Sequence, residues 1–395
     1  MDRQNEQDLR KEALRLYLTG LPPREVYRQL HRTKPWFFKW LNRYQSGEAN
    51  WYEDKSTAPH QVARKTPDPT ERAVLETRSK LEKSKYAQTG ALAIQWEMQK
   101  EGVTPPPTWT INRILKRHHA VREKQRYQPS GKAYPDVRRL FSESLQEADL
   151  VGPRYLKGQG RFYSLNVLDL ETYLVAVNPC RSKSDEEVAT GLLRTWKTIG
   201  KPDILQLDNE LSFRGSNRYP HSLGLVPRLC LALGVQVLFI PISEPWRNGA
   251  VERFQDTFDK CFYRRQFFPD FTALKQQAEC FEKFRNQNHR CTALGGKIPM
   301  QHVTSEGIPI RRLDASLKLK EVDLTLTDGY VHLVRFIRSD CLLNIFGEKF
   351  KVPKEVKYEY VIATICTKIH TLQVRLDQQL VTTFEYRIPI LYEHE

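Results

Sequence analysis

The 395-residue sequence lacks any run of 18 apolar residues, and its first ten residues, MDRQNEQDLR, are polar. A membrane-spanning helix needs about 20 mostly apolar residues, and a secretory signal needs an apolar stretch near its start. We therefore expect neither a membrane segment nor a secretory signal. Both absences favour a cytoplasmic protein.

Paired cysteines are missing as well: the seven cysteines include no C-x-x-C spacing, and their number is odd. Disulfide frameworks and structural zinc sites need paired cysteines, so we expect reduced thiols. The adjacent His118 and His119 have no cysteine pair at zinc-finger spacing, which indicates exposed residues of a basic face. The sequence also has no convincing Ser–His–Asp or Cys–His arrangement for a nucleophilic mechanism.

Acidic residues are in deficit, since 47 Asp and Glu stand against 62 Lys and Arg and give a net charge of +15. A basic surface attracts polyanions, nucleic acid first and anionic membranes second. Without a membrane segment, nucleic acid is the expected partner. The hydrophobic fraction of 40% suffices for folded cores, and the length predicts two to four domains.

Residues 1–50 have the pattern of three short helices, with apolar residues at helical spacing. Pro22 and Pro23 suit the start of the second helix, and the third begins at Pro35 and ends near Gly47. This pattern predicts a helix-turn-helix, although a plain helical bundle would also fit it. The candidate DNA contacts on the third helix are Lys34, Lys39, Asn42 and Arg43.

Residues 51–70 are polar with three prolines, which predicts a linker. A second helical unit is expected over residues 71–125, and its last helix, TINRILKRHHAVREKQR, is strongly basic. Two tandem helical units that each end in a basic helix predict a bipartite DNA site. The candidate DNA contacts of the second unit are Arg113, Lys116 and Arg117. The stretch QPSGKAYPDVR then predicts a second linker.

Residues 137–290 begin with strand-like segments and continue with alternating strands and helices, which predicts a mixed α/β sheet with helices on its faces. Asp149 lies in or just past the first strand, Asp208 ends the strand ILQLD, and Glu252 follows the loop PISEPWRNGAV at a helix start. Groups at strand ends and helix starts converge at one edge of such a sheet. Carboxylates that meet there repel each other, and bound Mg²⁺ or Mn²⁺ offsets the repulsion.

The segments around these acids, LQEADLVG, LQLDNELSFRG and PWRNGAVERF, together resemble the DDE integrase core. That core is the ribonuclease-H-like catalytic domain of retroviral integrases and of many bacterial insertion-sequence transposases, among which the insertion-sequence-481-like group is most similar. The resemblance implies that Asp149 and Asp208 share two metal ions and that Glu252 completes the ligands of the second. Such ions, about 3.5–4 Å apart, stabilise the attacking and leaving oxygens of an in-line phosphoryl displacement.

The resemblance also implies roles for the loop before the glutamate. Asn248 would fix the loop or touch the DNA, and Trp246 and Arg247 would lie against the substrate strand. Asp169, in NVLDLET, competes with Asp149 as the first acid. Two further acids are expected to be ordinary surface carboxylates, with the second a possible brace for the loop: Glu210 and Glu244.

Residues 313–395 alternate apolar and polar residues between turn residues, which predicts a small antiparallel SH3-like barrel that binds phosphates or a partner chain. The predicted protein is thus multidomain: all-α helix-turn-helix units, a central α/β ribonuclease-H-like domain and a C-terminal β-barrel. The resemblance implies a DNA transposase at the bacterial nucleoid that cleaves terminal inverted repeats, joins them to target DNA and works as a homo-oligomeric synaptic complex. The alternatives are a catalytically inactive DNA-binding regulator and a structure-selective nuclease.

Overall fold

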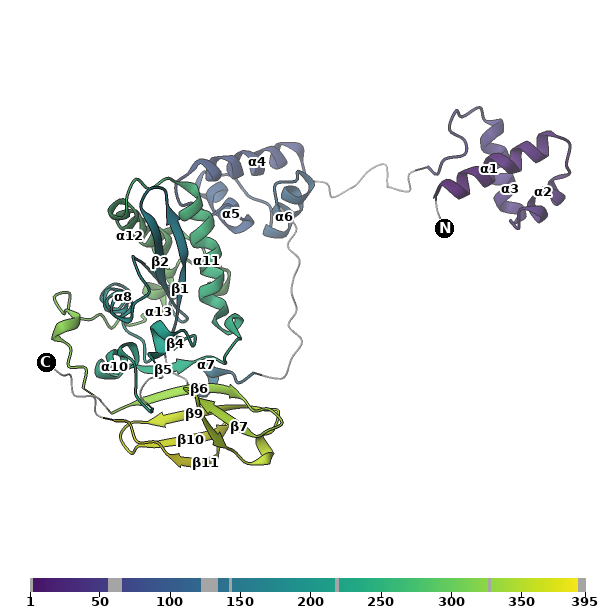
Figure 1. The fold of residues 1–395 in the computed structure, drawn as a ribbon. Helices are drawn as coiled ribbons and strands as arrows, with labels where there is room; N and C mark the ends of the chain where they lie inside the picture. Colours follow the sequence, from purple (N-terminus) through teal and green to yellow (C-terminus); the bar gives the residue numbers. More distant parts are fainter. Residues whose placement is uncertain are drawn as a thin grey trace. The chain divides into compact units, whose positions relative to one another are not determined.

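The computed structural model describes residues 3–55, 66–121, 134–141, 144–216, 220–325 and 328–389 (Figure 1). The chain divides into two compact units, Met1–Thr66 and Pro67–Glu395. Parts of both predicted linkers lie outside the described residues. Within the described residues, no helix is both long and apolar enough to cross a membrane. All seven cysteines are free thiols, as expected.

The first unit is a three-helix domain. Helix α1 spans Arg3–Leu18, α2 spans Pro23–Gln29 and α3 spans Lys34–Gln45. Pro23 occupies the first position of α2, where its missing N–H leaves no hydrogen bond unmade. Thr33 caps α3 by accepting a hydrogen bond from the Trp36 amide at 3.4 Å. The helices enclose a small core: Ala13, Leu14, Val26, Phe37, Trp40 and Leu41. The predicted helix-turn-helix region is therefore confirmed as helical.

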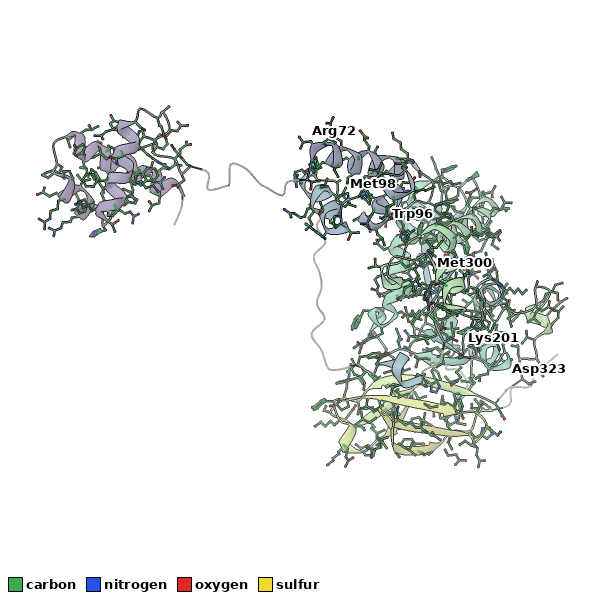
Figure 2. All side chains as sticks on the ribbon, turned by 180° about the vertical axis from the view of Figure 1, so that it is seen from behind. Arg72, Trp96, Met98, Lys201, Met300 and Asp323 are labelled. Atoms are coloured by element: carbon green, nitrogen blue, oxygen red, sulfur yellow. The ribbon has the colours of Figure 1, made fainter. Side chains whose placement is uncertain are left out.

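The second helical unit contains α4 (Asp68–Lys83), α5 (Ala91–Lys100) and α6 (Thr108–Arg117). Its core includes Met98 on α5, which Figure 2 labels beside Trp96. The helices lie where the sequence predicted them, but they pack against the central domain. The turn after α4 makes the contact, because Tyr86 donates its hydroxyl to Gln277 Oε1 at 2.6 Å.

The central domain is built on a mixed sheet with strand order β3-β2-β1-β4-β5. Strand β2 pairs antiparallel with β1 and β3, whereas β4 runs parallel to both β1 and β5. This order is that of the ribonuclease-H-like fold, so the predicted mixed sheet is confirmed. The strands are β1 (Leu145–Leu156), β2 (Gly160–Asp169), β3 (Val175–Cys180), β4 (Ile204–Leu207) and β5 (Gln236–Phe239).

Helices cover both faces of this sheet (Figure 1). One core includes residues of α8 (Asp185–Thr198) and α10 (Leu225–Ala232), packed against side chains such as Val167. The opposite core includes residues of α11 (Gly249–Cys261) and α12 (Phe271–Asn288). The shorter elements are α7 (Val137–Phe141), α9 (Leu211–Arg214), α13 (Pro299–Glu306) and the 3-10 turn η1 (Pro245–Asn248).

The C-terminal strands continue the central sheet. Strand β6 pairs in parallel with β5, with Phe239 opposite Leu333, and β9, β10 and β11 follow as antiparallel neighbours. A separate SH3-like barrel is therefore not confirmed. The alternation of apolar residues predicted the strands but could not show that β6 covers the otherwise open edge of β5. The strands are β6 (Tyr330–Phe336), β9 (Tyr360–Cys366), β10 (Thr371–Leu376), β11 (Gln379–Glu385) and the two-stranded pair β7 (Leu342–Ile345) and β8 (Glu348–Lys351).

Candidate active site at the carboxyl edge of the sheet

Asp149 and the residue that follows β4, Asp208, lie near each other where the parallel pairing of two neighbouring strands ends. In the register of β1 and β4, Glu147 is opposite Gln206; Asp149 comes two residues later on β1, and Asp208 is the first residue after β4. Neighbouring strands are about 4.8 Å apart, and residues two apart share one face of a sheet. The two aspartates therefore form a pair at the carboxyl edge, on the face that Glu147 and Gln206 share.

The carboxylates at this edge of the sheet have raised pKa values, in part because their negative charges repel one another. Burial raises the pKa of Asp208 to about 6, and repulsion by Asp149 and Glu210 contributes. Burial also raises the pKa of Asp149, to which Glu210 adds repulsion. For Glu252, burial raises the pKa and Asp149 adds to the rise. Asp149 thus contributes to the raised pKa of both other predicted catalytic acids.

A buried carboxylate from β1 fixes the helix that carries Glu252. Glu147, 5% exposed, accepts hydrogen bonds from the amides of Ala250 and Val251, each at 2.9 Å. The residue that precedes α11, Asn248, makes no capping bond of its own. Glu147 therefore caps the N-terminus of α11 from strand β1. The helix dipole favours a negative charge at that end of the helix.

Asn248 holds the loop before α11 against the sheet. Its side-chain oxygen accepts a hydrogen bond from Gln206 Nε2 at 2.8 Å, and its amide donates to the Ala148 carbonyl at 3.3 Å. The residue is only 2% exposed. Of the two roles that the resemblance implied, fixing the loop is the one that matches this burial, since DNA has no access to the amide.

Arg247 belongs to a cluster of side chains that contact one another. Its Nε donates to Glu244 Oε2 at 2.9 Å, and its guanidinium carbon lies 3.9 Å from the centroid of the Tyr134 ring. Glu244 also accepts a hydrogen bond from the Tyr360 hydroxyl at 2.8 Å, so its expected role as a loop brace is observed. Trp246, in contrast, is 52% exposed. Contact of Trp246 and Arg247 with a substrate strand stays a prediction.

Asp169, the competing first acid, lies toward the other end of β1, where it pairs in register with Gln146. Its carboxylate accepts hydrogen bonds from the Thr172 amide and hydroxyl, both at 2.8 Å, and from Gln146 Nε2 at 3.1 Å. These bonds close the turn after β2. The acid that the sheet brings beside Asp208 is Asp149.

Three neighbours of the aspartates were not singled out as site residues from the sequence. Gln255 donates a hydrogen bond from its Nε2 to Asp149 Oδ2. Its spacing of three residues from Glu252 on one helix face is the signal that could have found it. Glu210 forms an ion pair with Lys183 and adds to the raised pKa values of both aspartates. Lys183 comes from the loop before α8, and no sequence signal points to it.

The donor set suits a hard divalent cation, because carboxylate oxygens are the preferred ligands of Mg²⁺ and Mn²⁺. Among the described residues, however, no group of three His, Cys, Asp or Glu side chains is gathered closely enough to hold a metal ion. Asp149 instead accepts from Gln255 and from the Leu150 amide, and Asp208 from the Glu210 amide. The residues fit an ion by charge and ligand type, and binding requires the carboxylates to converge further.

The predicted DNA contacts of α3 face solvent for the most part. Lys34, Lys39 and Asn42 are exposed, whereas Arg43 is half-buried and donates to the Glu53 carbonyl at 2.8 Å. This helix therefore presents three exposed polar side chains, of which Lys34 and Lys39 lie over aromatic rings of the helix, and their contact with DNA stays a prediction.

The basic residues of α6 are exposed as well. Arg113, Lys116 and Arg117 all face solvent, although Arg117 forms an ion pair with Glu71. Trp109, one turn before Arg113, is 61% exposed. An exposed aromatic ring among cations is typical of nucleic-acid surfaces, and this contact too stays a prediction.

The strand order and the acids at its carboxyl edge define the class of the central domain as ribonuclease-H-like. At the N-terminus, residues 5–52 match the family model of a homeodomain-like domain. Both parts that the resemblance to DDE integrases implied, a helix-turn-helix and a ribonuclease-H-like core, are thus present in the chain.

The chain is similar to solved structures of viral integrases, at low sequence identity. The catalytic core domain of HTLV-2 integrase in complex with magnesium is 17% identical over 40% of this chain and 94% of that one, with a TM-score of 0.30. A chain of the simian T-cell lymphotropic virus intasome is 15% identical over 76% of this chain and 96% of that one, with a TM-score of 0.36. The catalytic core domain of BIV integrase is 16% identical over 41% and 95%, with a TM-score of 0.30.

Proposed function

We propose that the protein is a DNA transposase, a metal-dependent polynucleotidyl transferase that cuts the ends of a mobile element and joins them to target DNA. One observation carries this proposal: Asp149 on β1 and Asp208 directly after the adjacent β4 both have raised pKa values, and Glu147, also on β1, binds the first turn of the helix that carries Glu252. Such a concentration of carboxylates is unfavourable unless a cation is bound.

The three acids would hold two Mg²⁺ or Mn²⁺ ions. When bound, these ions activate the attacking oxygen and offset the charge on the leaving oxygen. Asp149 and Asp208 supply oxygens from the rigid sheet, and Glu252 supplies a third from the capped end of α11. The attacking group is water for cleavage and a DNA 3′-hydroxyl for joining, so no nucleophilic side chain is needed.

The helical units are proposed to bind the terminal inverted repeats through α3 and α6. Their exposed cations neutralise phosphates, so affinity should fall steeply as salt is raised. Two element ends are processed together, which calls for a homodimer or a larger synaptic assembly on the DNA. We propose that this reaction takes place at the bacterial nucleoid, where the DNA substrate lies.

An assay of end cleavage tests the function directly. A labelled duplex with the inverted repeats that flank the gene is incubated with the protein and Mg²⁺, and nicked and joined products are separated on a denaturing gel. We expect both products, and we expect Asp208→Asn to abolish them while DNA binding in a gel shift persists. Binding without cleavage by the wild type would indicate a regulator, and preferential cutting of branched junctions would indicate a structure-selective nuclease.

A further inference from the structure

Two of the C-terminal strands contact the turn after Asp208 and the loop that leads to Glu252, which we call the two catalytic loops. Strand β6 follows β5 in parallel register, and β9 is its antiparallel neighbour, with Phe336 opposite Tyr360. Arg335 and Tyr360 extend from this pair of strands toward the carboxyl edge of the central sheet, and each contacts a different catalytic loop.

Arg335 contacts the turn that follows Asp208. Its Nη2 donates to Asn209 Oδ1 at 2.8 Å, and its Nη1 donates to the Ile240 carbonyl at 3.0 Å. Asn209 closes the network by donating its own amide to the same Ile240 carbonyl at 2.6 Å. The residue next to Asp208 is thereby fixed both to β6 and to the end of β5.

The burial of Arg335 is unfavourable in itself. The side chain is 5% exposed, and burial lowers its pKa to about 10. Within the described residues, the acceptors that its guanidinium reaches are all neutral oxygens, the others being the Val334 and Asn344 carbonyls. A buried charge without an ion partner is costly and is kept only where its hydrogen bonds serve a purpose.

Tyr360 contacts the loop that leads to Glu252. Its hydroxyl donates to Glu244 Oε1 at 2.8 Å and accepts from Arg247 Nη2 at 3.4 Å. Glu244 and Arg247 are bonded to each other, and Arg247 directly precedes the buried Asn248. The loop is thus held from the C-terminal sheet on one side and from Gln206 on the other.

We propose that Arg335 and Tyr360 are positioning residues, through which the C-terminal sheet sets the spacing between Asp208 and Glu252 for divalent-metal binding. This inference rests on the proposed function. It makes the C-terminal region a part of the catalytic unit, whereas the sequence predicted a separate barrel. Neither residue touches the reacting atoms: Arg335 acts through Asn209, and Tyr360 acts through Glu244 and Arg247.

The full-length chain is tested as three variants, Arg335→Met, Arg335→Lys and Tyr360→Phe. Lysine keeps the charge of Arg335 but loses the fork that reaches Asn209 and Ile240 at once. Tyr360→Phe removes a single hydroxyl, so it retains the fold even where Arg335→Met does not. Arg338→Met and Tyr358→Phe are matched controls, because both side chains are exposed and lie near the same strands.

Five quantities are measured for each variant: Tm, the turnover number for strand transfer, the KM for end DNA, the Mn²⁺ concentration at half-saturation from calorimetry without DNA, and the hydrogen exchange of backbone amides. We expect turnover to fall about 10²-fold in Arg335→Met and about 10-fold in Tyr360→Phe, because small misplacements of catalytic groups have effects of this size. Half-saturating Mn²⁺ should rise in both, with KM for DNA unchanged. Hydrogen exchange should quicken in residues 206–210 for the Arg335 variants and in residues 244–248 for Tyr360→Phe.

The inference is overturned if Tyr360→Phe and Arg335→Lys keep wild-type turnover and Mn²⁺ affinity, or if their losses simply follow a fall in Tm. It is equally overturned if the two control variants show the same losses. An inactive wild type that also fails to bind Mn²⁺ contradicts the proposed function itself. The two failures are therefore distinguishable in one set of measurements.

Discussion

At the scale of single residues, the position of Glu252 depends on a glutamate that takes no part in the chemistry. Glu147 lies two residues before Asp149 and is buried. Its carboxylate accepts hydrogen bonds from amides in the first turn of α11. Gln206, opposite it in register, holds Asn248 of the same loop. The strands that carry the two aspartates thus also set the direction of the helix that carries the third acid.

Glu147→Ala should destabilise the protein by about 1–2 kcal/mol, because it removes the cap of α11 and leaves two buried amides unpaired. Glu147→Gln should lose less, since its side-chain oxygen still accepts a hydrogen bond. Strand transfer should fall in the same order. Urea unfolding and the end-cleavage assay measure both effects, with the exposed Glu186→Ala on α8 as control. Equal stability of Glu147→Ala and wild type would refute the capping role.

Asp208→Asn should stabilise the metal-free protein while it abolishes cleavage. Burial and repulsion raise the pKa of Asp208 to about 6, so its ionised form is disfavoured in the fold at pH 7.5. One pKa unit corresponds to about 1.4 kcal/mol, and the gain should be about 1–3 kcal/mol. Thermal unfolding in EDTA measures it. A lower Tm for Asp208→Asn would mean that the carboxylate is well accommodated without metal.

At the scale of elements, the end of α12 joins the second helical unit to the catalytic domain. His289 Nε2 donates to the Tyr86 carbonyl at 2.6 Å, and its Nδ1 is buried. The pKa of His289 is lowered to about 4, mainly by burial and in part by the nearby charges of Arg285 and Arg265, while the hydrogen bond to the Tyr86 carbonyl acts in the opposite direction. The imidazole therefore stays neutral in the folded chain down to pH values at which the unfolded chain is protonated.

The sign of the pH dependence follows from this difference. Below about pH 6.5 the unfolded state binds a proton that the folded state does not, so stability is lost as pH falls from about 6.5 to about 4. Burial also lowers the pKa of His332 to about 4, so the unfolded state binds a second proton in the same pH range. His289→Gln should reduce the slope by about 1.4 kcal/mol per pH unit in that window. Urea unfolding at several pH values tests this, and an unchanged slope in His289→Gln would contradict it; the exposed His370→Gln is the control.

The elements themselves were largely predictable from the sequence, because periodicity is local. The helices of both helical units and the strands around Asp149 and Asp208 lie where apolar spacing placed them. The pairing of β6 with β5 was not predictable, because the alternation of apolar and polar residues along a strand does not indicate which strand lies next to it. The same limit hid Glu147 and Gln206, whose roles depend on the register between two strands distant in the chain.

At the scale of the whole molecule, recognition and chemistry are expected to be separable. Residues 1–66 form one compact unit and residues 67–395 another. Removal of residues 1–60 should therefore abolish recognition of the element ends but leave weak, nonspecific, metal-dependent cleavage. The preference for end DNA over random DNA is measured by competition binding, with the full chain and with the chain that lacks residues 1–60. Retained end preference in the shortened chain would place recognition in α4–α6 instead.

The sequence predicts the three acids from their motif context, and of the two candidate first acids the sheet brings Asp149 rather than Asp169 toward Asp208. Their exact spacing was not visible, since it depends on ties from β1, β4, β6 and β9 that lie far apart along the chain. The claim on which the function depends is that these acids converge on divalent ions.

The most direct test is the anomalous difference density of a crystal of the full chain soaked in Mn²⁺. We predict peaks between Asp149 and Asp208, with Glu252 as a ligand of one ion, and loss of that ligation in Glu252→Gln. Manganese bound elsewhere, or bound by the aspartates with Glu252 remote from every ion, would contradict the account.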